Sequence, residues 1–192
     1  MGTTQNSRII FVCTGNYYRS RLAEILFNDY ALKAALRWDA ESKGLFDRAS
    51  VKGLSPDAAR FLESKGFDSV EQFAREPERL RVEDLEHSQL LIILNKSEHE
   101  PIMKVKFGRV PTMLEKSGRL RYWNVYDVPS RRRMTDRIFK PNEGGEQPPI
   151  SSCEHIDFAV QTLVHELGST GLNASDANED IGSPIPTNPR FS

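Results

Sequence analysis

A short apolar run near the N-terminus leads through a loop into a helical pattern, and this order constrains the fold more than any other feature. Residues 8–12 read Arg-Ile-Ile-Phe-Val, a composition typical of a strand buried in a parallel sheet. From Leu22 to Ala34 apolar residues recur at spacings of three and four, which predicts an amphipathic helix. A strand, a tight loop and a helix in this order predict the opening unit of an α/β fold.

The alternation of strands and helices continues along the chain. Further strands are predicted at 37–41, 90–94 and 120–125, and further helices at 55–65, 98–106 and 156–167. A second short helix and a loop are expected within the charged residues 67–86. Ser55, which precedes a proline, is a suitable cap for the helix that Gly66 ends. Ser97 is the expected cap of the helix at 98–106.

The length of 192 residues suits one domain with a substantial core. We expect a domain over 1–168, a long loop insertion at about 130–154 and a disordered tail over 169–192. The insertion contains three consecutive arginines, a glycine pair and a proline pair, and the tail is rich in Ser, Asn, Pro and Gly.

Charge and cysteine content exclude several classes of protein. Lys and Arg number 26 against 27 for Asp and Glu, so no broad basic surface for nucleic acid is expected. No apolar stretch approaches the ~18 residues of a membrane span, and the first residues lack the apolar run of a signal peptide. The two cysteines, Cys13 and Cys153, cannot form a disulfide framework or a four-cysteine zinc site. We therefore expect a soluble, cytoplasmic protein with reduced thiols.

The sequence gives no reason to expect a metal or another cofactor. Capping or surface roles are expected for the histidines, which lack metal-ligand spacing: His87, His99, His155 and His165. No G-x-G-x-x-G or G-x-x-x-x-G-K-S/T run occurs, which argues against a nucleotide-binding module.

The loop from Cys13 to Ser20 has the character of an anion site. It is expected at the carboxyl end of a strand, where open α/β sheets bind ligands. The backbone amides of residues 14–19 can form a concave nest, and the N-terminus of the following helix adds positive potential. Both features stabilise a phosphate dianion and favour a thiolate over a thiol at Cys13.

Individual side chains of this loop fit the same chemistry. Arg19 can hold two phosphate oxygens with its guanidinium fork. Ser20 can donate a hydrogen bond to the sulfur of Cys13. Gly15 leaves room for the ligand, and Asn16 tolerates a left-handed backbone while its side chain bonds the loop. We therefore favour a reactive Cys13 over an inert core cysteine.

The segment Val12-Cys13-Thr14-Gly15-Asn16-Tyr17-Tyr18-Arg19-Ser20 resembles the loop of the low-molecular-weight protein tyrosine phosphatase family, V-C-x-G-N-x-C-R-S. Ser42-Lys43-Gly44 resembles the S-A-G that follows the second strand of that family. The resemblance covers about residues 7–130 and the helix at 156–167. It implies a four-stranded parallel sheet flanked by helices, in a phosphatase I-like, flavodoxin-like α/β/α arrangement of three layers.

The resemblance also implies a reaction. Cys13 would attack a phosphotyrosine monoester and form a phosphocysteine, which water then hydrolyses. Asp127 would serve as general acid and then as base, although Asp127-Val128-Pro129 is one residue longer than the family's D-P motif. The phosphoryl group would be bound by Arg19 and by the loop residues Thr14, Gly15, Asn16, Tyr17, Tyr18 and Ser20. The implied substrate is a phosphotyrosine-containing protein or a small aryl phosphate.

Three departures from the family pattern affect these expectations. Tyr18 stands where the family usually has a second cysteine, so the chain should lack that oxidative protection. The tyrosine pair that follows D-P in the family is absent, and Ser130 with Arg131, Arg132 and Arg133 stands there instead; the three arginines can attract an acidic partner. Tyr17 can stack on a phenyl phosphate, whereas the phosphoarginine-selective relatives carry a threonine at this position.

Two other functions stay open. A non-catalytic or weakly catalytic phosphotyrosine-binding module would keep the loop and Arg19 but misplace Asp127. An arsenate reductase of related fold shares C-T-G-N-x-C-R-S but needs two further cysteines to resolve its adduct. Tyr18 argues against that chemistry, and Cys153 is expected to be an ordinary loop thiol.

Overall fold

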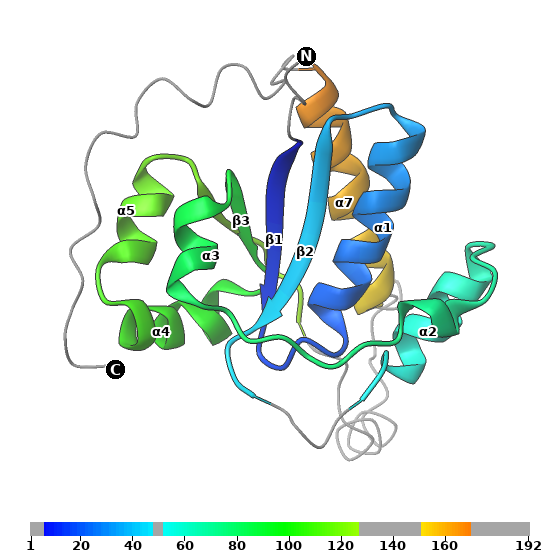
Figure 1. Cartoon of the computed structure of the whole chain (residues 1–192), viewed down its shortest axis with the longest axis horizontal. Helices are drawn as coiled ribbons and strands as arrows, with labels where there is room; N and C mark the ends of the chain where they lie inside the picture. The colour runs from blue at the N-terminus through cyan, green and yellow to red at the C-terminus, as the bar shows by residue number, and fades with distance from the viewer. Residues whose placement is uncertain (1–5, 48–51, 127–150, 170–192) are drawn as a thin grey trace, which may run out of the picture.

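The computed structural model describes residues 6–47, 52–126 and 151–169, which form a parallel sheet with helices on both faces (Figure 1). The strands are β1 Ser7–Cys13, β2 Trp38–Gly44, β3 Leu90–Ile93 and β4 Leu120–Tyr122. They pair in parallel in the order β2-β1-β3-β4. The predicted four-stranded α/β/α fold is therefore confirmed.

The helices divide between the two faces of the sheet (Figure 1). One face is covered by α1 Arg19–Lys33 and α7 Ser152–Ser169. The helix α2 Pro56–Ser64 and the short 3-10 helix η1 Val70–Phe73 lie beside these two. The other face is covered by α3 Val82–His87, α4 Lys96–Phe107 and α5 Val110–Lys116.

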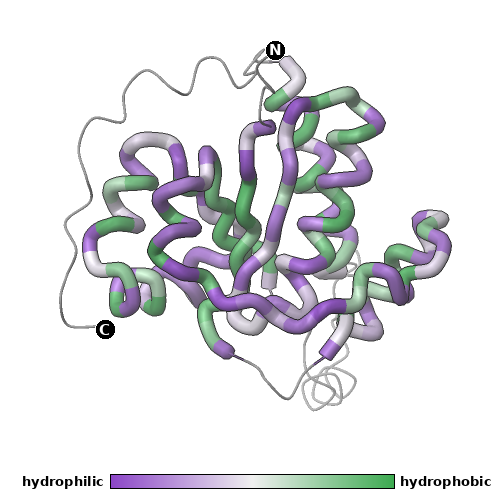
Figure 2. The backbone as a smooth tube through the Cα atoms, in the orientation of Figure 1, coloured by the Kyte–Doolittle hydropathy of each residue, from purple (hydrophilic) through white to green (hydrophobic). Residues whose placement is uncertain are grey.

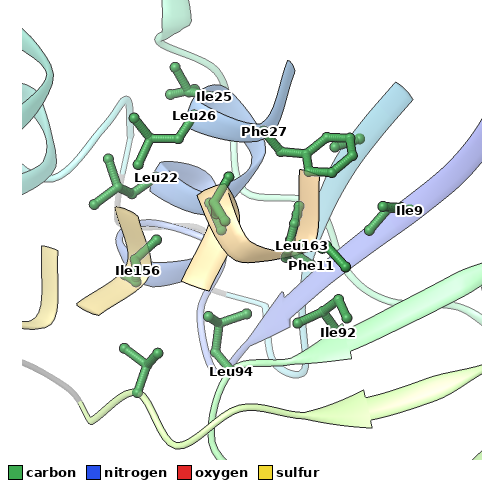
Figure 3. Packing of buried hydrophobic residues seen from close by; sticks show 14 of the residues in the cluster. Ile9, Phe11, Leu22, Ile25, Leu26, Phe27, Ile92, Leu94, Ile156 and Leu163 are labelled. Carbon is green, nitrogen blue, oxygen red and sulfur yellow. The ribbon is translucent and has the colours of Figure 1, made fainter. Parts of the chain in front are cut away.

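Strand β1 connects two hydrophobic cores. Ile9 and Phe11 pack toward α1 and α7, as Figure 3 shows, while Ile10 and Val12 pack toward α3, α4 and α5. All four side chains are fully buried. Alternate residues of a strand point to opposite faces, so a strand that is apolar at every position must lie between two layers of helices. This is the physical reason why residues 8–12 predict the fold.

Three helices differ from the expectations. Helix α4 is capped by Asn95, whose side chain accepts a hydrogen bond from the first turn, and Ser97 lies inside the helix. Helix α5 was not expected, and Pro111 lies in its first turn, where proline needs no hydrogen-bond partner. Helix α7 begins at Ser152, earlier than the expected position 156.

Much of the predicted insertion and the predicted tail lies outside the described residues. The described part of the insertion, from 151 onward, leads directly into α7. The division into a domain over 1–168 and a tail therefore stays a prediction. In the part of the chain that is described, no helix is long and apolar enough to cross a membrane.

Candidate active site

The loop from Cys13 to Arg19 lies at the carboxyl edge of the sheet, between β1 and α1 (Figure 1). Strand β1 has β2 on one side and β3 on the other. The chain therefore passes from β1 to a neighbour on one side and then returns to add β3 and β4 on the other side, which reverses the strand order at β1. Such a switch point is where open α/β sheets bind ligands. The loop carbonyls of Cys13, Thr14 and Tyr17 accept hydrogen bonds of 3.0, 3.0 and 3.1 Å from backbone N–H groups outside the loop. The loop is therefore held in place by its surroundings before any ligand binds.

Cys13 ends β1 and is only 4% exposed, and its Sγ lies 3.0 Å from Ser20 Oγ. Ser20 Oγ also accepts a hydrogen bond of 3.1 Å from Asn16 Nδ2. Because that bond uses a lone pair of the oxygen, the hydroxyl hydrogen of Ser20 can point to the sulfur. The structure thus places Ser20 as the sequence predicts, and an ionised sulfur would gain most from the contact.

Asn16 has a φ of 48° and is buried, in agreement with the left-handed conformation expected for it. Its Nδ2 donates to Ser42 Oγ at 2.7 Å, and its Oδ1 accepts from the Glu78 backbone N–H at 2.8 Å. A Cβ at Gly44 would lie 3.1 Å from the Cβ of Asn16, so the absent side chain lets the loop approach the end of β2. Asn16 therefore joins the loop to two distant segments.

Arg75 is a member of this network that the sequence analysis missed. It donates to Asn16 Oδ1 at 3.1 Å and to Glu24 Oε2 at 3.0 Å, and it forms an ion pair of 3.0 Å with Glu78. Burial raises the pKa of Glu78, but the hydrogen bond from Lys43 and the charge of Arg75 outweigh burial and leave the pKa below its usual value. The segment between η1 and α3 is largely hydrophilic and passes the carboxyl end of β2 (Figure 2), and Arg75 belongs to this segment by its place in the sequence. A charge run carries no local signal that one of its arginines points inward.

Arg19 begins α1 and is 3% exposed. Its Nη1 lies 2.9 Å from Glu98 Oε2 and donates to the carbonyl of Val125 at 3.1 Å. Glu98 belongs to α4, and Val125 follows β4. The guanidinium group is therefore oriented by two elements that are remote in sequence, at the same edge of the sheet as Cys13.

His99 is fully buried, so of the two roles expected for the histidines, capping or a surface position, the structure gives it the capping role. Its Nδ1 accepts the backbone N–H of Asn95 at 3.1 Å. The other ring nitrogen, Nε2, therefore carries the hydrogen and donates to Thr14 Oγ1 at 3.0 Å. Besides capping the start of α4, this histidine fixes the first residue of the loop after Cys13.

Cys153 lies in the first turn of α7 and is 7% exposed, so the expectation of an ordinary loop thiol is wrong. Its Sγ lies 3.1 Å from the hydroxyl of Tyr18 and 3.9 Å from the carbonyl of Asp57. Burial raises the pKa of the Tyr18 hydroxyl and that of the Cys153 thiol, so both stay protonated near neutral pH. Tyr18 therefore links the loop to α7, and Cys153 is held as a thiol.

The remaining predicted site residues divide into two groups. Tyr17 is half-buried in the loop, and Gly15 is buried there. Asp127, with Arg131, Arg132 and Arg133, lies outside the described residues. Among the residues that are described, no group of three His, Cys, Asp or Glu side chains is arranged to hold a metal ion.

The family model of low molecular weight phosphotyrosine protein phosphatases matches residues 8–171, and the chain belongs to this family. A protein-arginine-phosphatase from Bacillus subtilis (strain 168) is 34% identical over 101 residues. That match covers 53% of this chain and 63% of the relative, so the chain spans less than two thirds of the relative's length.

Solved structures share the fold. A low molecular weight protein tyrosine phosphatase from T. tengcongensis superposes with a TM-score of 0.59 at 22% identity, over 84% of this chain and 99% of that one. An arginine phosphatase from Geobacillus stearothermophilus superposes with a TM-score of 0.52, also at 22% identity, over 85% of this chain and 92% of that one. At such identities the likeness concerns the fold alone.

Proposed function

We propose that this protein is a phosphatase that hydrolyses phosphotyrosine monoesters through a phosphocysteine intermediate. The observation that carries the proposal is the 3.0 Å contact between Cys13 Sγ and Ser20 Oγ, in a loop that also presents the buried Arg19. A cysteine sulfur in contact with a hydroxyl group, in a loop that ends at an arginine and a helix N-terminus, is suited to react as a thiolate with a phosphate ester.

The reaction has two steps. In the first, the Cys13 thiolate attacks phosphorus, the S–P bond forms and the bond to the leaving oxygen breaks, while the carboxylic acid of Asp127 donates its proton to that oxygen. In the second, a water molecule attacks phosphorus and loses a proton to the Asp127 carboxylate. The S–P bond breaks, inorganic phosphate leaves, and the Ser20 hydroxyl donates a hydrogen bond to the released thiolate.

Protein groups supply the positive potential for both steps in this scheme. The guanidinium group of Arg19 donates two parallel hydrogen bonds to phosphoryl oxygens, and the amides of residues 14–19 surround the others. Glu98 and Val125 already orient Arg19, so little side-chain freedom is lost when the phosphate binds. The scheme requires no metal ion or other cofactor.

Phosphoarginine is a second candidate substrate, because a relative of this chain is a protein-arginine-phosphatase. We expect Tyr17 to decide between phosphotyrosine and phosphoarginine. An aromatic side chain at this position can stack on a phenyl ring, and it narrows the space for a guanidinium leaving group. We expect kcat/KM for a phosphotyrosine peptide to exceed that for the matched phosphoarginine peptide by at least about tenfold. In Tyr17→Thr this ratio should fall by about tenfold, while Tyr17→Phe should preserve it. A wild-type protein that prefers phosphoarginine would contradict the proposed substrate class.

The Asp127→Asn variant tests the general acid. It is expected to lower kcat for a phosphotyrosine peptide by about 10²–10³-fold, within the range that general acids contribute. Supporting this role, Asp127 follows by two positions Val125, whose carbonyl accepts a hydrogen bond from Arg19. The loss should be smaller for an aryl phosphate with an acidic leaving group, which needs less protonation.

The matched control for this test is Asp136→Asn, which removes a carboxylate from the same segment and should change kcat by less than about twofold. If Asp136→Asn lowers kcat, and lowers it less for a substrate with an acidic leaving group, the assignment of Asp127 as the general acid is wrong.

The acidic partner proposed for Arg131, Arg132 and Arg133 rests on their charge alone. The alternative, a phosphotyrosine-binding module, predicts that the wild type binds the peptide without turning it over.

A further inference from the structure

A groove of about 840 Å³ adjoins the candidate active site and has no part in the proposed reaction. Three segments form it: the two residues Phe46 and Asp47 after β2, residues 79–82 at the start of α3, and residues 101–102 and 105–107 of α4. Two contacts connect it to the loop. The Phe46 backbone N–H donates to the carbonyl of Thr14 at 3.0 Å, and α4 also supplies the His99 side chain that contacts Thr14. The groove therefore lies next to Thr14, at the start of the phosphate loop.

The groove exposes large apolar side chains. Phe46 and Val82 are each 45% exposed, and Val105 is 77% exposed. The buried Leu80 and the partly buried Ile102 lie among them. Water-exposed apolar side chains grouped in a concave surface are typical of a site that binds another chain.

The charges of the groove are mostly positive. It contains three cations, Arg79, Arg81 and Lys106, and one carboxylate, Asp47, which pairs with Arg79 at 3.2 Å. Lys106 Nζ lies 4.8 Å from the centroid of the Phe46 ring. Within the described residues, neither the Arg81 guanidinium group nor the Lys106 ammonium group forms an ion pair, while the Arg81 backbone N–H donates to Asp84 Oδ2 at 2.8 Å. The groove therefore offers two cationic side chains above an apolar surface.

We propose that this groove binds the stretch of a phosphoprotein substrate that flanks the phosphorylated residue, and that this stretch carries both acidic and apolar side chains. The inference rests on the proposed function, in which the loop binds the phosphate, and on the hydrogen bond by which Phe46 adjoins Thr14 of that loop. Acidic side chains meet Arg81 and Lys106, and apolar ones cover Phe46 and Val105. The phosphate loop supplies the chemistry, and the groove selects among phosphoproteins by adding contacts that p-nitrophenyl phosphate cannot make.

The test compares two matched phosphotyrosine peptides. The acidic–apolar peptide carries Asp and Leu on one side of the phosphotyrosine, and the neutral peptide carries Ser and Asn there. The N-terminal and the C-terminal side are varied in turn. The double variant Arg81→Glu/Lys106→Glu should lower kcat/KM for the acidic–apolar peptide by about tenfold and leave the neutral peptide and p-nitrophenyl phosphate within about twofold. The difference should shrink at high salt, where exposed charges are screened. Val105→Ser, which changes no charge, should lower kcat/KM for the acidic–apolar peptide by about threefold.

Controls and outcomes separate this proposal from the proposed function. Lys33→Glu/Lys116→Glu makes the same charge change on exposed residues outside the groove and should leave the peptide preference unchanged. Equal kcat/KM for the two wild-type peptides, or the same loss in both double variants, would overturn the docking proposal while the phosphatase stands. If the groove variants change the oligomeric state measured by sedimentation and leave the peptide preference unchanged, the groove binds a second copy of the chain, and the docking proposal is also overturned. Absence of wild-type turnover on every substrate would instead contradict the proposed function.

Discussion

Cys13→Ser is expected to lower kcat for p-nitrophenyl phosphate by at least about 10⁴-fold. A serine hydroxyl is a much weaker nucleophile than a thiolate, and the neighbour of this position, Ser20, is a hydrogen-bond donor rather than a base. The oxygen could keep the contact with Ser20, so the loop should keep its conformation and still bind phosphotyrosine peptides. Rapid quenching of the wild type followed by mass spectrometry should detect phosphate on Cys13.

Cys153→Ser is the matched control, because Cys153 is the other cysteine and is similarly buried. The sulfur of Cys153 contacts Tyr18 and stays protonated, so it does not act as a nucleophile. Replacement of Cys153 by serine should therefore change kcat by less than about threefold. An equal loss of activity in both variants would show that the assay reports folding rather than nucleophilic attack. Wild-type turnover at the level of Cys13→Ser, with peptide binding intact, would favour the phosphotyrosine-binding module.

Arg19→Lys is expected to lower kcat/KM for p-nitrophenyl phosphate by about 10²–10³-fold, the usual effect of removing a donor aimed at charge that develops in the transition state. Lysine keeps the charge but cannot donate two parallel hydrogen bonds to one phosphoryl group. The ammonium group can still pair with Glu98, so the variant tests geometry rather than net charge. Inorganic phosphate should correspondingly become a weaker competitive inhibitor.

Arg60→Lys provides the control for Arg19→Lys. Arg60 is an exposed arginine of α2 that pairs with Asp57, and its replacement should leave kcat/KM unchanged within about twofold. If Arg19→Lys retained full activity, the bidentate contact would have no part in the reaction and the proposed clamp would be wrong.

The elements that could be predicted from the sequence are those whose cause is local. The apolar run of β1 and the three- and four-residue spacing of α1 reflect the burial of each element on its own faces, and both elements lie where they were expected. Asn16 and Ser20 lie within a few residues of Cys13, so their mutual contacts follow from one loop conformation. Helix α5 was missed because its seven residues are too short to show a clear period.

The parts of the site that escaped prediction depend on residues that only the fold brings together. Arg75 bonds Asn16 across 59 residues, His99 bonds Thr14 across 85, and Tyr18 contacts Cys153 across 135. No residue adjacent in the sequence to any of these three distant partners indicates that the partner contacts the loop. A partly buried arginine such as Arg75 is indistinguishable in sequence from a solvated one, because its partners come from other strands and helices.

By itself, then, the sequence determined the α/β class, the loop at the carboxyl end of β1, and the sulfur, hydroxyl and guanidinium groups within that loop. These follow from local periodicity and from the chemistry of eight adjacent residues. Only the tertiary structure decided how Arg19 is oriented, which histidine and which second arginine hold the loop, and that Cys153 is buried in a helix. It also decided that a basic, apolar groove adjoins the loop. The physical reason is that the parallel sheet brings the ends of β1, β2, β3 and β4 to one edge, and the sequence separates those ends by tens of residues.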